Sequence, residues 1–281
     1  MRLLEYLLVR FPEYKKTKLK QFLKYGSVTV NGVAQTAYDH ALCPGDRVDL
    51  LDRLSALREG LKSQLSFSIV YEDDWVVVVD KPPGLLTMGS EKEKKRTLYY
   101  ELTAYVRSQT KEGRGRVFIV HRLDREASGL VVFAKRESAK RALQDNWRDA
   151  VKKYYAVVEG VPKKRSAVIE SYLAEDEFRR VYSANEHSRG AKHARTRYEV
   201  LRAGGSYALL DVTLLTGRKN QIRVHLSDLG CPIAGDEKYG GRTNTAGRLL
   251  LHAYFLSFNH PETGEIKTFK TALPAPFTKL V

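Results

Sequence analysis

Phe118-Ile-Val-His-Arg-Leu-Asp-Arg-Glu-Ala-Ser-Gly-Leu-Val-Val-Phe133 is the stretch around which the rest of the chain is organised. Its apolar ends, residues 118–120 and 130–133, are typical of buried strands. The polar segment between them is then a short loop, and Ser128-Gly129 provides residues suited to its turn. Reactive groups are commonly placed on loops that a rigid sheet supports. We therefore predict that Asp124, within this loop, is the reactive residue.

The composition indicates a polyanionic partner. The chain has 281 residues, a net charge of +15 and a pI near 9.7, which favours nucleic acid. No apolar run approaches the roughly 18 residues that span a bilayer, and residues 1–14 do not resemble a signal peptide. Cys43 and Cys231 have neither metal-site spacing nor the pattern of a disulfide framework. We therefore expect a cytoplasmic protein that binds neither membrane nor metal.

The first 52 residues are predicted to form a small domain of their own. Leucines 3, 4, 7 and 8 have helical spacing, and residues 17–24 form a second short helix. Residues 28–30 then read as a strand, followed by a tight turn at Asn31-Gly32. Gly45-Asp46 forms another turn before residues 47–50. This order predicts a compact helix-helix-hairpin unit.

A basic run crosses these two helices. Between Arg10 and Lys24, a single acid, Glu13, stands among six cations. A solvated helix face is the simpler interpretation, but surfaces that serve solubility alone mix both signs of charge. With its Val-Asn-Gly and Gly-Asp turns, residues 18–50 resemble an S4-type RNA-binding domain. The resemblance implies contact with RNA phosphates through Lys15, Lys16, Lys18, Lys20 and Lys24.

The remaining chain is predicted to be a linker, residues 53–65, and a larger domain, residues 66–281. Strands dominate the larger domain, and its helices are interspersed irregularly, so that a doubly wound parallel fold is excluded. The fold class is α+β, with a mixed, mainly antiparallel sheet. The paired acids Asp73 and Asp74 lie between two predicted strands, where such residues usually form turns and seldom catalyse.

The larger domain resembles the RluA-type pseudouridine synthases. His121-Arg-Leu-Asp124 followed by Ser128-Gly-Leu130 closely matches the signature of that family. The resemblance extends over residues 67–273. Six further family motifs occur there in family order: Lys81-Pro-x-Gly84, Lys152-x-Tyr154-x-Ala156, Gly217-Arg-x-x-Gln-Ile-Arg223-x-His225, Gly235-Asp-x-x-Tyr-Gly240, Leu251-His-Ala253 and His260-Pro261. The chain departs from the usual pattern at Ala127, Asn220 and Met88, where the family often has Thr, His and His. These departures concern fine specificity.

The resemblance implies a role for each matched site residue. Asp124 would be the catalytic carboxylate, Tyr154 would stack on the target base and assist proton transfer, and Arg223 would keep Asp124 charged. The substrate-binding residues would be Arg122, which enters the RNA where the base leaves it, Leu251, which packs under the base, and also Arg218 and Lys81.

Some assignments remain open at the level of sequence. Asp124 alone could belong to a structural ion pair, and either Tyr154 or its neighbour Tyr155 could face the site. His121, His225 and His252 lack the spacing of a metal motif and are interpreted as core residues.

The function predicted from these residues is isomerisation of uridine to pseudouridine in structured RNA. Large-subunit ribosomal RNA is favoured as the substrate and transfer RNA comes second, because S4-like domains often accompany the former choice. Isomerisation needs no redox equivalent, so no cofactor is expected, and the chain is expected to act as a monomer. The alternative is a non-catalytic RNA-binding or ribosome-assembly factor that keeps the same fold.

Overall fold

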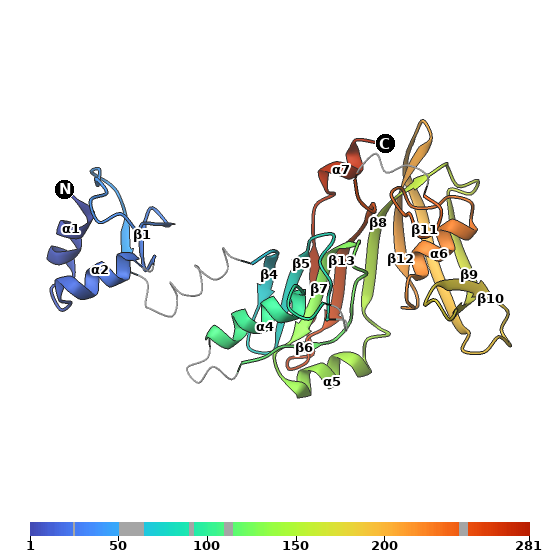
Figure 1. Ribbon diagram of the computed structural model, residues 1–281, viewed down its shortest axis with the longest axis horizontal. Helices are drawn as coiled ribbons and strands as arrows, with labels where there is room; N and C mark the ends of the chain where they lie inside the picture. The colour runs from blue at the N-terminus through green and yellow to red at the C-terminus, as the bar shows by residue number, and fades with distance from the viewer. Residues whose placement is uncertain (25, 51–64, 90–92, 110–114, 242–246) are drawn as a thin grey trace. The chain divides into compact units, whose positions relative to one another are not determined.

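The structure is a computed structural model that describes residues 1–281 except 25, 51–64, 90–92, 110–114 and 242–246. The linker predicted at residues 53–65 lies outside the described residues apart from residue 65. The chain divides into two compact units, one of residues 1–66 with 101–116 and the other of residues 67–100 with 117–281. Figure 1 shows the elements of each unit.

The first 50 residues contain the predicted helices and strands. The elements are α1 (Leu3–Arg10), α2 (Lys16–Lys24), β1 (Val28–Val30), β2 (Val33–Ala34) and β3 (Val48–Leu50). The strands form a small antiparallel sheet in the order β2-β1-β3. Leu3 and Leu7 of α1 and Leu19 of α2 are fully buried against Val28. The helical spacing of these leucines therefore produces a genuine core.

Two polar turns close this small core. The Asn31 side-chain nitrogen donates to Asp46 Oδ1 at 2.8 Å, and the backbone nitrogen of Arg47 donates to Asn31 Oδ1 at 3.0 Å. The Val-Asn-Gly and Gly-Asp turns are therefore joined to each other. This contact explains why the two motifs occur as a pair at this separation.

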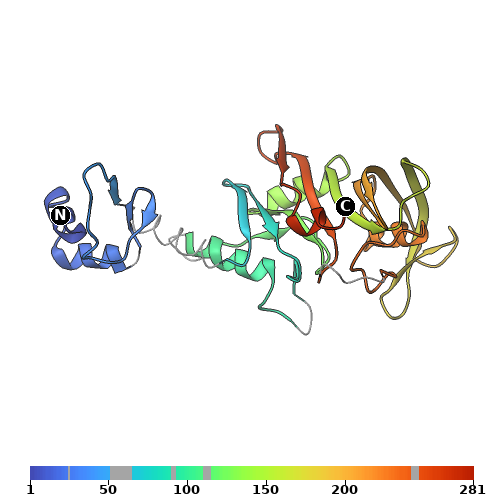
Figure 2. The same cartoon turned by 90° about the horizontal axis from the view of Figure 1, so that it is seen from above.

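The second unit is built on one large sheet (Figures 1 and 2). Its strands are β4 (Ser68–Glu72), β5 (Val76–Lys81), β6 (Phe118–Ile119), β7 (Ser128–Ala134), β8 (Val151–Glu159), β9 (Ser166–Glu175), β10 (Val181–Ala184), β11 (Lys192–Gly204), β12 (Tyr207–Leu214), β13 (Leu251–Asn259) and β14 (Ile266–Lys270). The described strands follow the order β10-β9-β11-β12-β8-β13-β7-β5-β4, with β14 beside β13 and β6 beside β7. The described helices after residue 66 are α4 (Leu98–Gln109), α5 (Glu137–Asp145), α6 (Gln221–Asp228) and α7 (Ala275–Thr278).

The sheet is mixed and mainly antiparallel, as predicted. Among the described strands, only β7 and β13 run parallel, with His252 opposite Ser128 and Ala253 opposite Gly129. Gly129 has a φ of +117°, and a Cβ atom there would lie 2.3 Å from the Ala253 carbonyl oxygen. Only glycine allows this close approach of two backbones. The glycine of the opening motif therefore makes the junction at the centre of the sheet possible.

The core and the helices explain where the site forms. Residues 76–79 of β5 and 130–134 of β7 are almost completely buried, which is the pattern of strands covered on both faces. Helix α5 packs against β7, and α6 packs against β9, β10 and β11. Helix α6 begins at Gln221, because residues 217–220 form a loop with Asn220 at the N-cap position. This loop and the one before β7 carry the candidate site.

Candidate active site

The loop between β6 and β7 holds Asp124 at the start of the central parallel pair. Because parallel neighbours begin at the same edge of a sheet, this loop lies beside Leu251, the first residue of β13. Thr87 Oγ1 accepts a hydrogen bond from the Leu123 backbone nitrogen at 3.2 Å and donates to the Leu123 carbonyl at 2.9 Å. The residue immediately before Asp124 is therefore fixed from the Lys-Pro-x-Gly side of the sheet.

Lys81 supports the same loop from below. Its side chain is completely buried, and its Nζ donates to the carbonyl oxygens of Pro82, Leu85 and Arg125 at 2.9, 2.9 and 3.2 Å. Burial lowers the pKa of Lys81 to about 7, although the negative charge of Asp124 acts in the opposite direction and raises it. The sequence assigned Lys81 to substrate binding. In the structure its ammonium group joins two loops through their carbonyl groups, and substrate binding stays a prediction.

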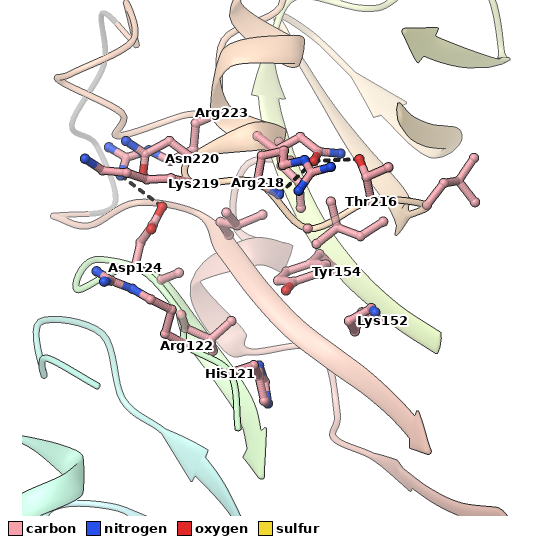
Figure 3. Close-up of a pocket in the computed structure, with 18 of the residues that line it drawn as sticks. His121, Arg122, Asp124, Lys152, Tyr154, Thr216, Arg218, Lys219, Asn220 and Arg223 are labelled. Atoms are coloured by element: carbon pink, nitrogen blue, oxygen red, sulfur yellow. Dashed lines mark hydrogen bonds and ion pairs between the residues drawn. The ribbon is translucent and has the colours of Figure 1, made fainter. Parts of the chain in front are cut away.

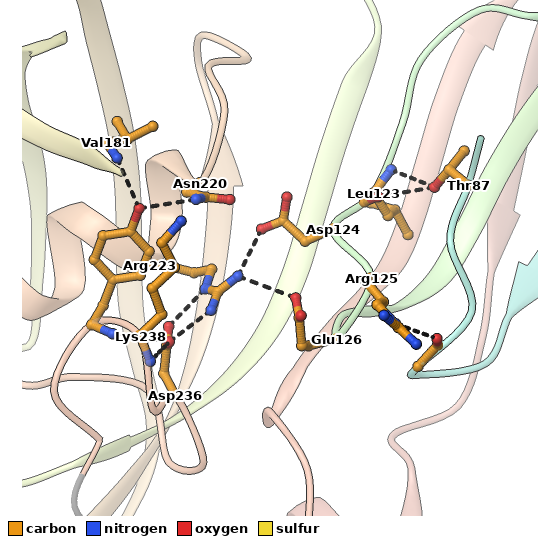
Figure 4. A network of polar contacts seen from close by, with 12 residues as sticks. Thr87, Leu123, Asp124, Arg125, Glu126, Val181, Asn220, Arg223, Asp236 and Lys238 are labelled. Carbon is orange, nitrogen blue, oxygen red and sulfur yellow. Dashed lines mark hydrogen bonds and ion pairs between the residues drawn. The ribbon is translucent and has the colours of Figure 1, made fainter. Parts of the chain in front are cut away.

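A single arginine connects three carboxylates at the centre of the site (Figure 4). Arg223, on α6, donates from Nε and Nη2 to the two oxygens of Asp236 at 2.8 and 2.7 Å. Its Nη1 lies 3.3 Å from Asp124 Oδ2 and 3.4 Å from Glu126 Oε2. The predicted pairing of Arg223 with Asp124 is therefore present, but the shorter, bidentate contact is to Asp236.

Asp236 anchors this arginine, and the sequence did not single it out. Its side chain is fully buried and that of Arg223 is 6% exposed. Burial alone would lower the pKa of Arg223, but the hydrogen bonds to Asp236 and the charges of the nearby carboxylates raise it above its ordinary value. The guanidinium therefore stays charged, with a planar geometry that suits a bidentate carboxylate. The position of Asp236 beside Gly235 in a motif shared with the family was the one available signal.

A cavity of about 800 Å³ opens beside Asp124 (Figure 3). This size is within the range of pockets that enclose a small ligand. Asp124 is the one carboxylate among the described lining residues, whereas six of them are cationic: Arg122, Arg148, Lys152, Arg218, Lys219 and Arg223. The cations of the cavity therefore favour a polyanion. The part of that ligand next to the Asp124 carboxylate should be uncharged, because two negative charges would repel each other.

The cavity settles which of two adjacent tyrosines faces the site. Tyr154 lines the cavity and is 7% exposed. Tyr155 points to the opposite face of β8, where its ring is stacked on that of Tyr254 with centroids 3.8 Å apart. Burial, and then the charge of Asp124, raise the pKa of Tyr154 above its ordinary value. The phenol therefore keeps its proton at neutral pH and presents a neutral aromatic face to the cavity.

The other predicted substrate residues also meet at this cavity. Arg122, Arg218 and Leu251 line it together with Asp124. Arg122 is exposed, and Figure 3 shows it on the Asp124 side of the cavity. Arg218 is held by its Nε, which donates to the carbonyl oxygen of His193 at 3.1 Å. Leu251 is 4% exposed and contributes an apolar patch to the wall.

His225 and His252 are hydrogen-bonded core residues as predicted, whereas His121 is half-buried and lines the cavity. His225 contacts Thr196 and Ser171 through its two ring nitrogens, at 2.8 and 3.0 Å. His252 contacts Ser128 and Thr271, both at 2.8 Å, and His121 Nε2 accepts from the backbone nitrogen of Val132. Within the part of the chain that the structure describes, no group of three or more His, Cys, Asp or Glu side chains is arranged to hold a metal ion.

The five lysines of the predicted RNA-binding face lie on α2 and in the turn before it. Lys15, Lys16, Lys20 and Lys24 are exposed. Lys18 is partly covered, with its Nζ 5.1 Å from the centre of the Phe22 ring. Because Leu19, Phe22 and Leu23 point into the small core, the lysines occupy the opposite, outer part of the helix.

Comparison with known proteins identifies the family of the chain. Residues 75–228, more than half of the chain, match the model of the RNA pseudouridylate synthase family. The chain belongs to this family. It is of the RluA type, and it is accordingly a pseudouridine synthase, an isomerase that acts on uridine in RNA.

Several relatives and one solved structure show how far the similarity extends. An uncharacterized RNA pseudouridine synthase of Bacillus subtilis is 34% identical over 96% of this chain and 89% of its own length. The ribosomal large subunit pseudouridine synthase D of Neisseria meningitidis (strain Z2491) is 34% identical over 94% of this chain and 73% of its own length. The structure of human RNA pseudouridylate synthase domain containing 4 superposes with a TM-score of 0.64 at 26% identity, covering 80% of this chain and 94% of that one. None of the enzyme's described helices is long and apolar enough to cross a membrane.

Proposed function

We propose that the Asp124 carboxylate carries out the chemistry of this synthase. Isomerisation breaks the bond between the ribose C1′ and N1 of uracil, turns the base, and joins C1′ to C5, while the hydrogen of C5 is replaced and N1 gains one. A carboxylate can serve this reaction as a nucleophile or as a base. The observation that carries the proposal is the placement of Asp124 at the cavity, 3.3 Å from the Arg223 guanidinium.

The remaining lining residues suit a uridine that has left its helix. Extruding a nucleotide costs a few kcal/mol. Stacking on an aromatic face contributes roughly 1–3 kcal/mol per base, which Tyr154 can supply, with Leu251 packing under the ring. Arg122 is exposed beside Asp124, where its guanidinium can occupy the space that the base leaves. Arg218 binds a phosphate of the same RNA.

The proposed substrate is structured ribosomal RNA of the large subunit. The cationic lining of the cavity supports a polyanionic substrate. The net charge of +15 supports a large polyanion such as a folded RNA. The Neisseria relative is named as a pseudouridine synthase of the ribosomal large subunit. Transfer RNA is the second candidate. We propose in addition that the enzyme acts as a monomer in the cytoplasm.

The change Asp124→Asn tests the catalytic assignment. RNA transcripts labelled with tritium at uridine C5 release the label when C5 takes the bond to ribose, so release reports the chemical step. We expect no release from the variant and an RNA dissociation constant within threefold of wild type, because the amide keeps the size of the carboxylate but loses its charge. Tritium release by Asp124→Asn at the wild-type rate would refute the assignment.

The RNA target is tested in cells. Pseudouridine mapping in a strain without this gene should show at least one uridine of large-subunit ribosomal RNA that is no longer converted. Complementation with the wild-type gene should restore it and complementation with Asp124→Asn should not. A lost site found only in transfer RNA would replace the proposed substrate by the second candidate. If no uridine in total RNA changed, the alternative of a non-catalytic assembly factor would be favoured.

We propose further that residues 1–52 form an S4-like domain that binds RNA phosphates through α2. Replacing Lys15, Lys16 and Lys20 with Gln removes three exposed charges. Because each phosphate contact contributes roughly 0.7–0.9 to the slope of log affinity against log salt, we expect the slope to fall by about 2. A control with Gln at Lys163, Lys164 and Lys279, exposed lysines of the catalytic unit, should change it less. Equal slopes for the two variants would refute the α2 contact.

A further inference from the structure

Asn220 occupies an unusual position next to the proposed catalytic carboxylate. It is the residue before α6 and adopts the left-handed conformation, with φ 52° and ψ 18°. Asparagine tolerates this conformation better than most residues. Its side chain is almost fully buried, and it lies between Asp124 and the hydroxyl group of Tyr239. A buried amide in this place must satisfy hydrogen bonds at both of its ends.

Only one orientation of the amide satisfies both ends. With its oxygen toward Asp124, the amide would place an acceptor against the two acceptor oxygens of the carboxylate. In the opposite orientation, Asn220 Nδ2 donates to Asp124 Oδ2 at 2.9 Å and to Oδ1 at 3.1 Å, and Asn220 Oδ1 accepts from the Tyr239 hydroxyl at 2.9 Å. The hydrogen-bond network thus assigns the orientation of the amide.

The hydroxyl group of Tyr239 is itself oriented by the backbone. It accepts a hydrogen bond from the Val181 N–H at 3.1 Å, at the first residue of β10. Its own proton is thereby free to point toward Asn220 Oδ1. The tyrosine is 4% exposed, and its ring lies beneath the guanidinium group of Arg223, 5.2 Å from the ring centre. A chain of hydrogen bonds therefore runs from Val181 through Tyr239 and Asn220 to Asp124.

We propose that Asn220 and Tyr239 are positioning residues that orient the Asp124 carboxylate for pseudouridine formation. The proposal rests on the proposed function, in which Asp124 reacts with the substrate. The two contacts of Asn220 are shorter than the 3.3 Å contact of Arg223, and both residues belong to the first turn of α6 and its N-cap. Two donors at the start of α6, an amide and a guanidinium, therefore determine the direction in which the carboxylate oxygens point.

The amide of Asn220 differs from a titrating side chain at this position because its donor does not depend on pH. Its N–H groups do not ionise, so the donor facing Asp124 is present at every working pH. A histidine, frequent in the family at this position, would donate only when the facing ring nitrogen carries a proton. The charged and titratable groups around the carboxylate and the amide include Arg223, Glu126, Asp236, Lys81, Tyr154 and Tyr239, and also Arg122 and Lys219 of the cavity lining.

The change Asn220→Asp gives a test that separates positioning from simple packing. It keeps the shape of the side chain but places a second carboxylate about 3 Å from Asp124. Removing one well-placed donor lowers rates by roughly 100-fold or more, and we expect such a loss in single-turnover tritium release at pH 8. As the pH falls to 6, the two carboxylates share a proton, one of them becomes a donor, and the rate should recover at least tenfold relative to wild type.

Two further variants complete the experiment. Tyr239→Phe removes the hydroxyl that fixes the amide, and we expect a loss of about tenfold without the pH recovery. Asn259→Asp adds the same charge at an exposed position and should behave as wild type. If Asn220→Asp stays within threefold of wild type at pH 8, or its loss is the same at pH 6 and pH 8, the positioning role is refuted. Wild-type activity of Asp124→Asn would instead overturn the proposed function itself, so the two failures are distinguishable.

Discussion

Replacing Asp236 with Asn should destabilise the enzyme and slow its chemistry together. Asp236 is fully buried and accepts two charge-assisted hydrogen bonds from Arg223 at 2.7 and 2.8 Å. Its Oδ1 also accepts from the backbone nitrogens of Lys238 and Tyr239 at 3.2 and 3.1 Å. An amide keeps one acceptor oxygen for these donors but turns an N–H group toward the guanidinium.

The structure sets the size of the effect. A hydrogen bond to a charged group contributes about 1.5–3 kcal/mol, and removing one partner of a buried ion pair costs about 3–5 kcal/mol. Because the amide preserves one acceptor, we expect a loss near the lower end, about 3 kcal/mol in the free energy of unfolding. Among the residues that the structure describes, the freed guanidinium of Arg223 then keeps Asp124 and Glu126 as counter-charges. A displaced carboxylate should slow single turnover by about 10–100-fold, equivalent to roughly 1.4–2.7 kcal/mol.

The assay combines urea unfolding with tritium release. Fluorescence of Trp75 and Trp147, the two tryptophans of the chain, follows unfolding of the catalytic unit. Asp74→Asn is the matched control, because it makes the same chemical change at an exposed turn residue. If Asp236→Asn unfolds within 0.5 kcal/mol of Asp74→Asn, the buried bidentate pair does not anchor Arg223. A normal turnover rate in a destabilised variant would refute the link from the anchor to Asp124.

Three further predictions concern the scaffold. Burial lowers the pKa values of His225 and His252 to about 4, whereas the unfolded chain takes up these protons near pH 6.5. The stability that these neutral histidines contribute should therefore be complete above pH 7. The free energy of unfolding should fall between pH 6.5 and 4, by about 2 kcal/mol per histidine at pH 5. Urea titrations should show that the unfolding free energy of His225→Asn depends less on pH than that of wild type, and an identical pH dependence would contradict this account. Gly129→Ala places a Cβ atom against Ala253 at a positive φ and should cost about 3 kcal/mol or more, whereas a stability equal to wild type in the same titration would exclude the close contact. Lys81→Met removes the ammonium donor from three carbonyl groups, of which that of Arg125 keeps the Gly84 N–H, and should lower the single-turnover rate about tenfold with unchanged RNA affinity. Reduced affinity alone would instead support the substrate contact that the family resemblance implies.

The helices, the strands and the small core could be read from the sequence because their signals are local. Helical spacing of Leu19, Phe22 and Leu23 places them on one buried face, and the run of valines at 76–79 becomes a covered strand. Each pattern depends only on backbone geometry and on apolar burial within a few residues. The same holds for the loop that carries Asp124, since a polar segment between two strands has to lie at the end of the sheet, although only β7 is buried and the two residues of β6 are partly exposed.

The arrangement around Asp124 could not be read in this way, because it depends on contacts across long stretches of chain. Arg223 is 99 residues from Asp124 and reaches it through α6, and motif similarity alone suggested the pair. That Asp236 is the stronger partner follows from its burial, which exists only once α6 packs on the sheet.

The residue pattern was sufficient to predict an acid-bearing loop at the start of a buried strand in a strongly basic protein. The tertiary structure decided which donors point at that acid. Arg223 and Asn220 approach it from one side, and Lys81 and Thr87 hold its loop from the other. Direction is a property of packed side chains at distances near 3 Å, and no local pattern of residues encodes it.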